Sequence, residues 1–366
     1  MGLWILLGLV VVGIALGLLA WTHLRRSELT AFDEPREAPF SERADPTEGQ
    51  ADALARISTL SADGAFGKKR LQALRTQLDT LFDLEDLPVE VRAAGAGHLA
   101  GEWVLAPGAD PDRRLLYVHG GGFVVGSPKS HRTLTAKLSQ LAGAAVLAVD
   151  YRLMPEHRRT AGIEDCQTAY RWILENGPDG AAPVQALFVA GDSAGGNLTL
   201  MLLAWARDEG LRAADGAVAL SPATDMTLRS PTLRANAATD PILRPLAAVF
   251  RLPITLLFYG SWLLARIRPD HPSVSPACGD LSNLPPTLVH GSDAEMLVGD
   301  GRRWVNKARA AGSPATLQTW PHMVHVWQMF GPELEETREA LDEIASFLER
   351  CAPRAAKSAE NIASQA

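Results

Sequence analysis

The segment Gly191-Asp192-Ser193-Ala194-Gly195 follows an apolar run at 186–189 and precedes a helical pattern. It fits the pattern G-x-S-x-G, in which a tight and strained turn between a strand and a helix pushes the serine hydroxyl out of the sheet. Side chains in place of Gly191 and Gly195 would collide with the neighbouring strand and helix. Such a short pattern also occurs by chance in ordinary turns, so its context matters. The chemistry that it predicts is nucleophilic attack by Ser193.

A second glycine-rich segment, His119-Gly120-Gly121-Gly122-Phe123, also follows an apolar run. Free backbone N–H groups in such a loop stabilise the oxygen that becomes negative in a tetrahedral intermediate. We expect the amides of Gly121, Gly122 and Ala194 to form this oxyanion hole, and His119 to orient the loop through its ring hydrogen bonds. A phosphate loop is the alternative, but neither a Walker lysine nor a G-x-G-x-x-G pattern is present.

A serine hydroxyl needs a base to remove its proton, and the base needs an acid to fix its tautomer. When the three groups follow the chain order Ser, Asp, His, the acid stands after a late strand. Asp293 has this position, directly beyond the apolar run 287–289. Asp300 is a rival, but it lies inside the following helical pattern, where we expect it to cap or pair locally. Asp225 is a weaker rival in a turn-like loop.

Two histidines, His322 and His325, lie in one loop after the last expected strand, 316–320. Either imidazole could serve as the base for Ser193, because both follow the nucleophile and the candidate acid in the chain. The residues alone leave this choice open.

Short apolar runs alternate with longer amphipathic segments over most of the chain. We expect strands near 115–118, 145–149, 186–190, 217–220, 287–289 and 316–320. We expect helices near 131–141, 163–174, 198–207, 300–311 and 334–348. This alternation predicts an α/β fold with a mostly parallel central sheet flanked by helices. Active sites in such folds lie at the carboxyl ends of the strands, which is where both glycine-rich segments fall.

The composition excludes several functional classes. The chain has 366 residues, 47% apolar and 21% charged, which suits one large domain with additional segments. A net charge of -7 is not typical of nucleic-acid binding. The three cysteines form no C-x-x-C pair and no H-E-x-x-H pattern is present, so we expect no disulfide framework, no metal and no cofactor.

Residues 1–21 contain no charged side chain and are long enough, at about 1.5 Å per residue, to cross a bilayer. We expect a transmembrane anchor at 1–24. A cleaved signal peptide is the alternative, but a basic start and a good cleavage site are missing. Arg25 and Arg26 follow the apolar segment, which favours a catalytic domain on the cytoplasmic side of the membrane.

The rest of the chain divides by composition. Residues 25–50 are rich in charge and proline and are expected to form a linker. Helical spacing of leucines begins after residue 51, and we expect the folded domain to extend over 51–350. Residues 351–366 are small and polar, which is typical of a flexible tail.

The motifs as a set resemble the hormone-sensitive lipase family of α/β-hydrolases. They are HGGGF at 119–123, DYRLMPEH at 150–157, EDC at 164–166, GDSAGGN at 191–197, SPATD at 221–225, DPIL at 240–243 and GSDAEMLVGD at 291–300. The resemblance runs from about residue 101 to 348.

The resemblance implies a role for each motif. Ser193 would be the nucleophile, Asp293 the acid and His325 the base. The oxyanion hole would be formed by Gly121, Gly122 and Ala194, with motif support from His119, Gly120, Gly191, Asp192 and Gly195. A helical cap over the pocket would come from about 51–87 and 226–275.

The chain departs from the family pattern in three places. The usual proline-rich run after PEH is replaced by residues 158–162, and Val326 stands where glycine commonly follows the histidine. Residues 252–265 are uncharged and flanked by arginines, too short to span a bilayer. We expect this segment to be a cap helix that contacts membrane lipid, and core packing is the alternative.

Together these features predict a membrane-anchored serine carboxylesterase, or lipase-like hydrolase, for lipophilic esters of short to medium acyl chains. A lactone hydrolase or a deacetylase on the same three residues is an alternative. So is a non-catalytic receptor for a small ligand, because the fold alone does not imply an activity. The oligomeric state is left open.

Overall fold

The computed structural model describes residues 28–41, 43, 45, 47–58, 67–81, 87–331 and 334–354, with isolated positions between 8 and 17. Apart from those positions, the predicted anchor at 1–24 lies outside the described residues, as do residues 355–366 of the predicted tail. Within the described ranges, no single helix has the length and hydropathy to cross a bilayer. The helix pair Arg244–Phe250 and Ile254–Ala265 meets those criteria only when taken together, with a bend of 111° between its halves.

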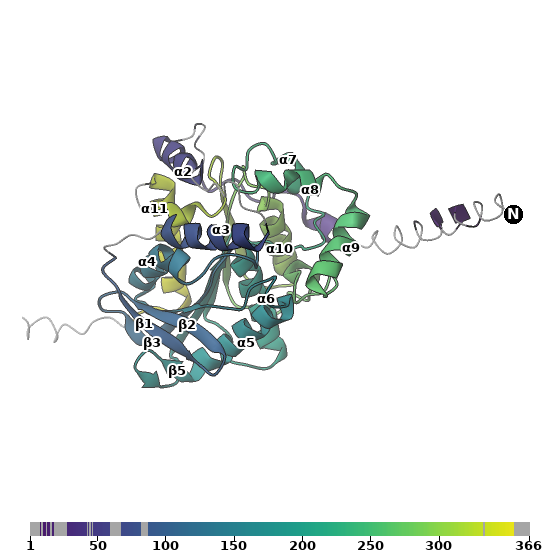
Figure 1. The fold of residues 1–366 in the computed structure, drawn as a ribbon. Coiled ribbons are helices and arrows are strands. Elements are labelled where there is room, and N and C mark those ends of the chain that lie inside the picture. The colour runs from purple at the N-terminus through teal and green to yellow at the C-terminus, as the bar shows by residue number, and fades with distance from the viewer. Residues whose placement is uncertain are drawn as a thin grey trace, which may run out of the picture.

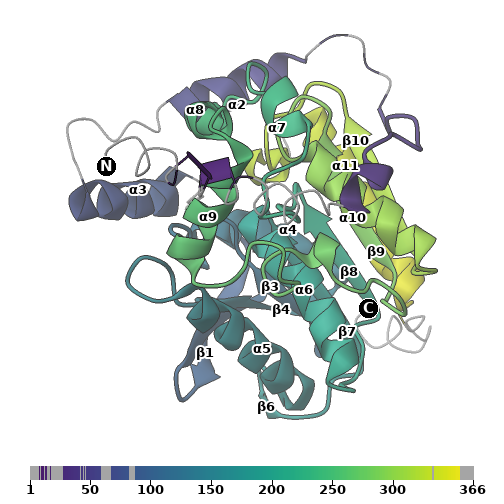
Figure 2. The same cartoon turned by 90° about the vertical axis from the view of Figure 1, so that its right-hand side faces the viewer.

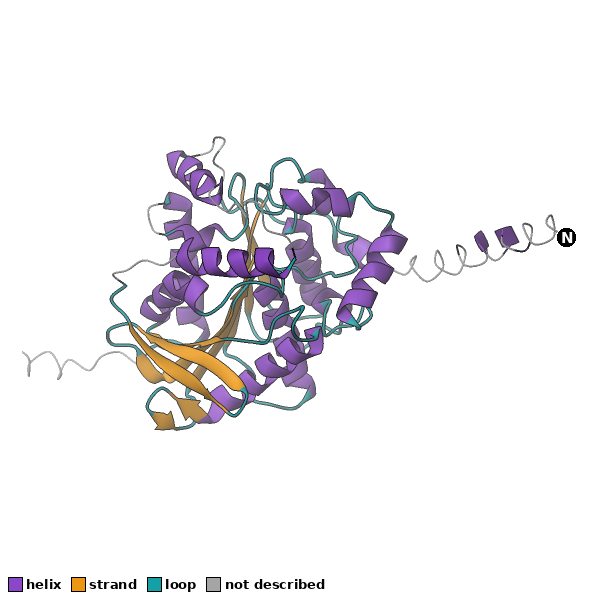
Figure 3. Ribbon diagram, in the orientation of Figure 1, coloured by secondary structure: helices purple, strands orange, loops and turns teal. Residues whose placement is uncertain are grey.

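An eight-stranded sheet forms the centre of the described chain (Figure 3). Its strands are β1 (Glu90–Ala96), β2 (Leu99–Leu105), β3 (Asp110–Val118), β4 (Ala144–Val149), β7 (Ala186–Asp192), β8 (Gly216–Leu220), β9 (Thr287–Ser292) and β10 (Ala315–Trp320). They lie in the order β1-β2-β4-β3-β7-β8-β9-β10, and β5 (Asn176–Gly177) and β6 (Gly180–Ala181) form a separate short pair. The β1–β2 and β2–β4 pairs are antiparallel, and all later neighbours are parallel.

Helices cover both faces of the sheet (Figures 1 and 3). One face carries α5 (Arg159–Glu175), α6 (Ala194–Asp208) and α10 (Val298–Ala310), and the other carries α4 (Arg132–Ala142) and α11 (Glu335–Cys351). In β3, Leu116 and Val118 belong to the first core, whereas Leu115 and Tyr117 belong to the second. Because both faces are covered, the strand is apolar at every one of these positions rather than at alternate ones.

The predicted fold class and the mostly parallel sheet are confirmed. The expected strands and helices all occur, but α5 and α6 begin four residues before the predicted starts at 163 and 198. Their first turns, at 159–162 and 194–197, carry glycine and polar residues. Helical periodicity of apolar side chains cannot detect such turns.

Further helices lie outside these two layers, and in both views α2, α7 and α8 are at one end of the molecule (Figures 1 and 2). They are α2 (Glu48–Ser58), α3 (Lys68–Leu81), α7 (Thr232–Ala235), α8 (Ala247–Phe250) and α9 (Ile254–Ala265). Short 3-10 turns are η1 (Glu28–Phe32), η2 (Lys129–His131), η3 (Arg244–Leu246), η4 (Pro276–Cys278) and η5 (Trp327–Phe330). Apart from the first three residues of α2, the helices fall in the two regions, about 51–87 and 226–275, in which the cap was expected.

The N-terminal segment 28–41, part of the predicted linker 25–50, packs against α10 and the end of β10. Leu29 is buried in the core. Asn306 on α10 donates its side-chain amide to the carbonyl oxygens of Phe32 and Glu34, at 2.9 and 3.0 Å. The segment is rich in charged residues, but Asp33 forms an ion pair with Arg303 instead of being fully solvated.

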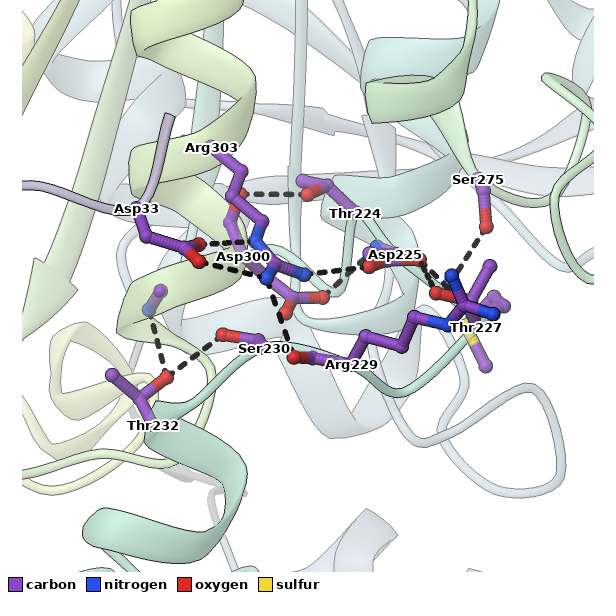
Figure 4. A network of polar contacts seen from close by, with 12 residues as sticks. Asp33, Thr224, Asp225, Thr227, Arg229, Ser230, Thr232, Ser275, Asp300 and Arg303 are labelled. Carbon is purple, nitrogen blue, oxygen red and sulfur yellow. Dashed lines mark hydrogen bonds and ion pairs between the residues drawn. The ribbon is translucent and has the colours of Figure 1, made fainter. Parts of the chain in front are cut away.

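Arg303 on α10 is the centre of that anchoring contact (Figure 4). Its side chain is fully buried, and its guanidinium donates to both Asp33 oxygens and, at 2.8 Å, to Asp225 Oδ2. Asp300 Oδ2 accepts the backbone N–H of Asp225 at 2.9 Å. Burial and the nearby Asp225 carboxylate raise the pKa of Asp300. Asp225 and Asp300, the two rivals for the catalytic acid, therefore belong to a structural network.

Replacing Arg303 should destabilise the fold strongly. In Arg303→Met the buried carboxylate of Asp225 loses its cation, and removing one partner of a buried ion pair costs about 3–5 kcal/mol of the free energy of unfolding. Urea denaturation followed by circular dichroism measures the loss. Arg268→Met is the matched control, because Arg268 forms a partly exposed pair with Asp270 and should cost less than about 1 kcal/mol. Equal losses in the two variants would contradict this account of the network.

Candidate active site

Ser193 lies at the turn between β7 and α6, where the sequence pattern placed it. Its backbone has φ 51° and ψ −115°, a sparsely populated conformation for a residue with a side chain. The Ser193 N–H donates to the Leu220 carbonyl at 2.7 Å, which fixes the turn to β8. A Cβ atom at Gly195 would overlap the Val118 carbonyl oxygen, and one at Gly191 would meet the same oxygen. Both glycines are therefore required by close packing, as predicted.

His325 and Glu295 complete a chain of contacts with this serine. The Nε2 atom of His325 lies 2.9 Å from Ser193 Oγ, and its Nδ1 atom lies 2.8 Å from Glu295 Oε2. His325 is 5% exposed and Glu295 is 1% exposed. A carboxylate on Nδ1 holds the imidazole in the tautomer whose Nε2 can accept the serine proton. The three groups thus have the geometry of a nucleophile, a base and an orienting acid.

Asp293, the predicted acid, does not contact His325. Its Oδ2 atom accepts the Thr319 hydroxyl at 3.1 Å, and its Oδ1 atom lies 3.6 Å from Arg302 Nη2. The turn that follows β9 explains the difference, because the Glu295 N–H donates to the Ser292 carbonyl at 3.0 Å. That bond closes the loop and brings residue 295, rather than residue 293, to the histidine.

Glu295 has a signal in the sequence, although the chain order Ser, Asp, His overlooks it. The loop after β9 contains two carboxylates, Asp293 and Glu295, and glutamate also serves as the acid in hydrolases with this chain order. Only the path of the turn distinguishes the two positions. His325 was preferred over His322 on the resemblance, and it is His325 that contacts the serine. The backbone carbonyl of His322 accepts a hydrogen bond from the Gln50 side chain.

Burial and pairing act in opposite directions on the site's ionisable groups. Burial alone would lower the pKa of His325, but the hydrogen bond and the charge of Glu295 outweigh it, so that the pKa is raised. Burial raises the pKa of Glu295, and the contact with His325 opposes that rise. A raised histidine pKa makes the ring a stronger proton acceptor, which suits a general base.

The glycine loop at 120–122 has the backbone that the oxyanion prediction requires. Gly121 has φ 109° and Gly122 has φ 61°, both in the left-handed region that favours glycine. A Cβ atom at Gly121 would overlap the Val125 carbonyl oxygen. Ala194 is the first residue of α6, so its N–H points from the positive end of the helix dipole. Among the described residues, the amides of Gly121 and Gly122 have no acceptor.

Asp192 joins the glycine loop to the serine turn. Its Oδ1 atom accepts the Tyr117 hydroxyl at 2.6 Å and the Gly120 N–H at 2.9 Å, and lies 3.3 Å from His131 Nε2. Burial would raise the pKa of Asp192, but His131 and the Tyr117 hydrogen bond lower it overall. A Cβ atom at Gly120 would overlap this carboxylate. The motif-support positions Gly120 and Asp192 therefore act together: the contacts of Asp192 with Gly120 and Tyr117, called here the Asp192 brace, hold the glycine loop against the serine turn.

His119 has a supporting place beside the loop. Its Nδ1 atom lies 2.8 Å from the Gly120 carbonyl oxygen, and its ring stacks on Tyr151 at 4.3 Å between centroids. Burial lowers the pKa of His119 to about 3, so the ring is neutral at physiological pH. These contacts agree with the expectation that it orients the loop.

A cavity of about 360 Å³ opens beside the oxyanion loop. Its lining includes Gly122 and Phe123 and several residues of α9. Most of the lining is apolar, which suits the hydrocarbon arm of an ester. No group of three or more His, Cys, Asp or Glu side chains that could hold a metal ion occurs in the described parts of the chain.

Comparisons with known proteins agree with this geometry. A family model described as alpha/beta hydrolase fold matches residues 115–329. A solved esterase from the bacterial hormone-sensitive lipase family superposes with a TM-score of 0.72 and 33% identity, covering 84% of this chain and 99% of that one. The chain belongs to the hormone-sensitive lipase family of α/β-hydrolases.

Relatives in the same family are ester hydrolases by name. The acetyl-hydrolase of Streptomyces hygroscopicus is 40% identical over 252 residues, which are 69% of this chain and 80% of that protein. A carboxylesterase/phospholipase of Mycobacterium tuberculosis is 34% identical over 255 residues, 69% of this chain and 66% of that one. This member of the hormone-sensitive lipase family is an ester hydrolase, as predicted.

The structure explains one departure from the family pattern. Val326, which replaces the common glycine after the histidine, has φ 53°, a conformation that valine rarely adopts. Its N–H donates to Ser221 Oγ at 3.2 Å, and its side chain is buried in the core around α11. These contacts hold the strained residue in place.

Glu295 and Asp293 should differ sharply on substitution. We expect Glu295→Gln to lower kcat by about 10²–10⁴-fold, because the amide no longer fixes the His325 tautomer or stabilises the imidazolium. Asp293→Asn should stay within about threefold of the wild type. Hydrolysis of p-nitrophenyl butyrate measures both. A larger loss in Asp293→Asn than in Glu295→Gln would restore Asp293 as the acid.

The pH profile gives a second readout of the same pair. Activity requires neutral His325, so kcat/KM falls as the pH drops through the raised pKa of this histidine. Without the charge of Glu295, burial lowers that pKa, and the acid limb of Glu295→Gln should move to lower pH. The limb of Asp293→Asn should not move. A purely structural role for Glu295 would lower activity without shifting the limb.

Proposed function

We propose that the chain is a serine carboxylesterase that cleaves lipophilic esters of short to medium acyl chains through an acyl-enzyme on Ser193. The observation that carries the proposal is the line of contacts from Ser193 Oγ through His325 to Glu295, at 2.9 and 2.8 Å. The apolar cavity beside Gly122 supports a lipophilic substrate.

The chemistry follows from these positions in two halves. In the first, Ser193 Oγ attacks the ester carbonyl carbon while His325 Nε2 takes the hydroxyl proton, and the resulting imidazolium is stabilised by Glu295. His325 then donates the proton to the departing alcohol, and the acyl group remains on Ser193. In the second half, water gives a proton to His325 and attacks the acyl carbonyl carbon; His325 then donates that proton to Ser193 Oγ as the acyl–oxygen bond breaks, which releases the acid and restores the serine.

The amides of Gly121, Gly122 and Ala194 are the proposed oxyanion donors in both halves. Their contribution is largest when the carbonyl oxygen is negative, and losing one donor typically costs about 3–4 kcal/mol of transition-state stabilisation. The Asp192 brace keeps the loop and the serine turn at one separation, so the donors need not reorganise during the reaction.

Removal of acetyl groups from a larger alcohol is a second candidate within the same chemistry. It is supported by the similarity to an acetyl-hydrolase at 40% identity. Lactones are internal esters and would react by the same steps. The acyl group and the alcohol of the preferred ester, rather than the mechanism, separate these possibilities.

Ser193→Ala should abolish both hydrolysis and covalent labelling. A fluorophosphonate probe should label the wild type stoichiometrically, because the activated hydroxyl attacks phosphorus as it attacks a carbonyl. Mass spectrometry of the intact protein measures the adduct. Rates on p-nitrophenyl esters from acetate to dodecanoate, together with a lactone and an acetylated sugar, assign the acyl preference. Folded wild-type protein that takes up no probe would contradict the proposal.

We also propose that the enzyme works at a membrane, held by residues 1–24, with its catalytic domain on the cytoplasmic side. The uncharged segment at 1–21 and the arginines that follow it support the anchor and the side. The second proposed contact is the apolar face of α9 and its neighbours.

The exposed side chains of that face support a lipid surface as its partner. Only Leu257 and Phe258 of α9 are buried, so core packing accounts for a small part of the helix. Large apolar side chains there are 39–80% exposed: Leu246, Val249, Leu252, Leu256, Tyr259, Trp262, Leu263 and Leu264. Arg244, Arg251, Arg266 and Arg268 flank the segment and would meet anionic headgroups. Four of the exposed residues, Val249, Leu252, Leu256 and Leu264, also line the cavity.

Flotation with vesicles of phosphatidylcholine and phosphatidylglycerol tests the two contacts separately. The full chain should float, and a form without residues 1–24 that keeps its esterase activity should float more weakly. In that shortened form, Leu263→Glu with Leu264→Glu should abolish flotation, whereas Val91→Glu on β1 should not. A shortened form that stays entirely in solution would refute the cap contact, and a full chain that does so would refute the anchor.

A further inference from the structure

Arg159 is a buried cation at the first residue of α5. It is 4% exposed, and its guanidinium carbon lies 3.6 Å from the centroid of the Phe123 ring. Its Nη2 atom donates to Asn197 Oδ1 at 3.0 Å. No carboxylate among the described residues forms a salt bridge with it. A guanidinium has five N–H donors, so most of its hydrogen-bonding capacity is unused within the protein.

The other buried arginines of the described chain are satisfied. Arg303 has two carboxylate partners. Arg114 donates to the carbonyl oxygens of Pro111, Ile173 and Ala182 and lies 3.4 Å from an Asp112 oxygen. Arg113 donates to the carbonyls of Ala142, Ala352 and Leu348. Arg159 therefore differs from them in lacking both a counter-ion and a set of carbonyl acceptors.

The charge of Arg159 is not cancelled by its surroundings. Burial lowers the pKa of Arg159 to about 10, which still leaves it protonated at neutral pH. The neighbouring Tyr151 and Cys166 could balance it only as anions, but burial raises the pKa of both. A buried, unpaired charge costs free energy in the empty site, and an anion that enters the site recovers that cost.

The position of Arg159 connects it to the substrate. It lines the 360 Å³ cavity together with Gly122, one of the proposed oxyanion donors, and Phe123. It is the only charged residue among those that line the cavity, and most of the remaining lining is apolar. It also lies in residues 158–162, where the chain departs from the family's proline-rich run.

We propose that Arg159 forms an anion-binding subsite, so that the preferred substrate is an ester whose arm in this cavity is apolar and carries a carboxylate or a phosphate. This inference rests on the proposed esterase function and names its substrate class. The cation on the cavity wall pairs with the anion while the apolar lining takes the hydrocarbon part. Asn197 and Phe123 hold the guanidinium in place.

Two substrates of matched length test the subsite. Mono-p-nitrophenyl adipate and p-nitrophenyl hexanoate differ by a carboxylate in place of a terminal methyl group. We expect Arg159→Met to lower kcat/KM for the adipate half-ester by at least about tenfold, the effect of a lost charge-assisted hydrogen bond. The same variant should stay within about threefold on the hexanoate ester. Arg159→Lys should recover part of the loss.

Inhibition distinguishes a preference for a carboxylate from a preference for a phosphate. It also detects the subsite whether the acyl arm or the alcohol arm of the ester carries the anion. Hexanoate and hexyl phosphate are each tested as inhibitors of hexanoate ester hydrolysis, with 1-hexanol as the neutral comparison. The Ki of the preferred anion should rise at least about tenfold in Arg159→Met, and that of hexanol should not change. Arg158→Met is the matched control, because it removes the same charge from the exposed neighbouring residue.

The outcomes distinguish this inference from the proposed function. Equal losses on both esters, with unchanged inhibition by both anions, would mean that Arg159 only packs against Phe123, and the subsite would be refuted. If Arg159→Met does not fold, wild-type inhibition decides: an anion that binds no better than hexanol refutes the subsite. A wild-type enzyme that hydrolyses neither ester would instead refute the esterase proposal.

Discussion

The buried carboxylate of Asp192 is the interaction on which the rest of the site depends. Tyr117 and Gly120, to which it bonds, lie at the end of β3 and just beyond it, while Asp192 itself is the last residue of β7. These two strands are hydrogen-bonded neighbours in the sheet. One side chain thus ties the loop of proposed oxyanion donors to the turn that carries Ser193. Because the carboxylate is buried with several donors around it, moving either loop would leave a charge unsatisfied.

The fold was predictable because its signals are local and repeated. The strands of the parallel part of the sheet, apart from β10, contain apolar runs, and the Ser193 turn and the glycine loop follow two of them. His325 could be chosen by resemblance. Glu295 could not be separated from Asp293, because both follow β9 and only the hydrogen bond that closes the turn decides which carboxylate faces the histidine. The packing of residues 28–41 also could not be predicted from the sequence, because it depends on an ion pair between Asp33 and Arg303, which are far apart in the chain.

Two of the three departures from the family pattern, residues 158–162 and 252–265, contribute to the cavity, whereas the third, Val326, directly follows the base His325. Arg159 and α9 both line the cavity, whereas Ser193 and the glycine loop follow the shared motifs closely. This division is physically reasonable, because the geometry of acyl transfer tolerates little change and the wall of a pocket tolerates much. A chain can therefore keep its chemistry and alter the molecules that reach it by changing a few wall residues.

The ion pair between Asp33 and Arg303 limits the distance between the catalytic domain and a bilayer. If residues 1–24 lie in the membrane, only residues 25–27 separate them from the first clamped turn, η1. A fully extended chain covers at most about 3.5 Å per residue, so the connection from residue 24 to residue 28 could span at most roughly 14 Å. The catalytic domain would then be unable to tumble freely, and one fixed side of it would always face the lipid.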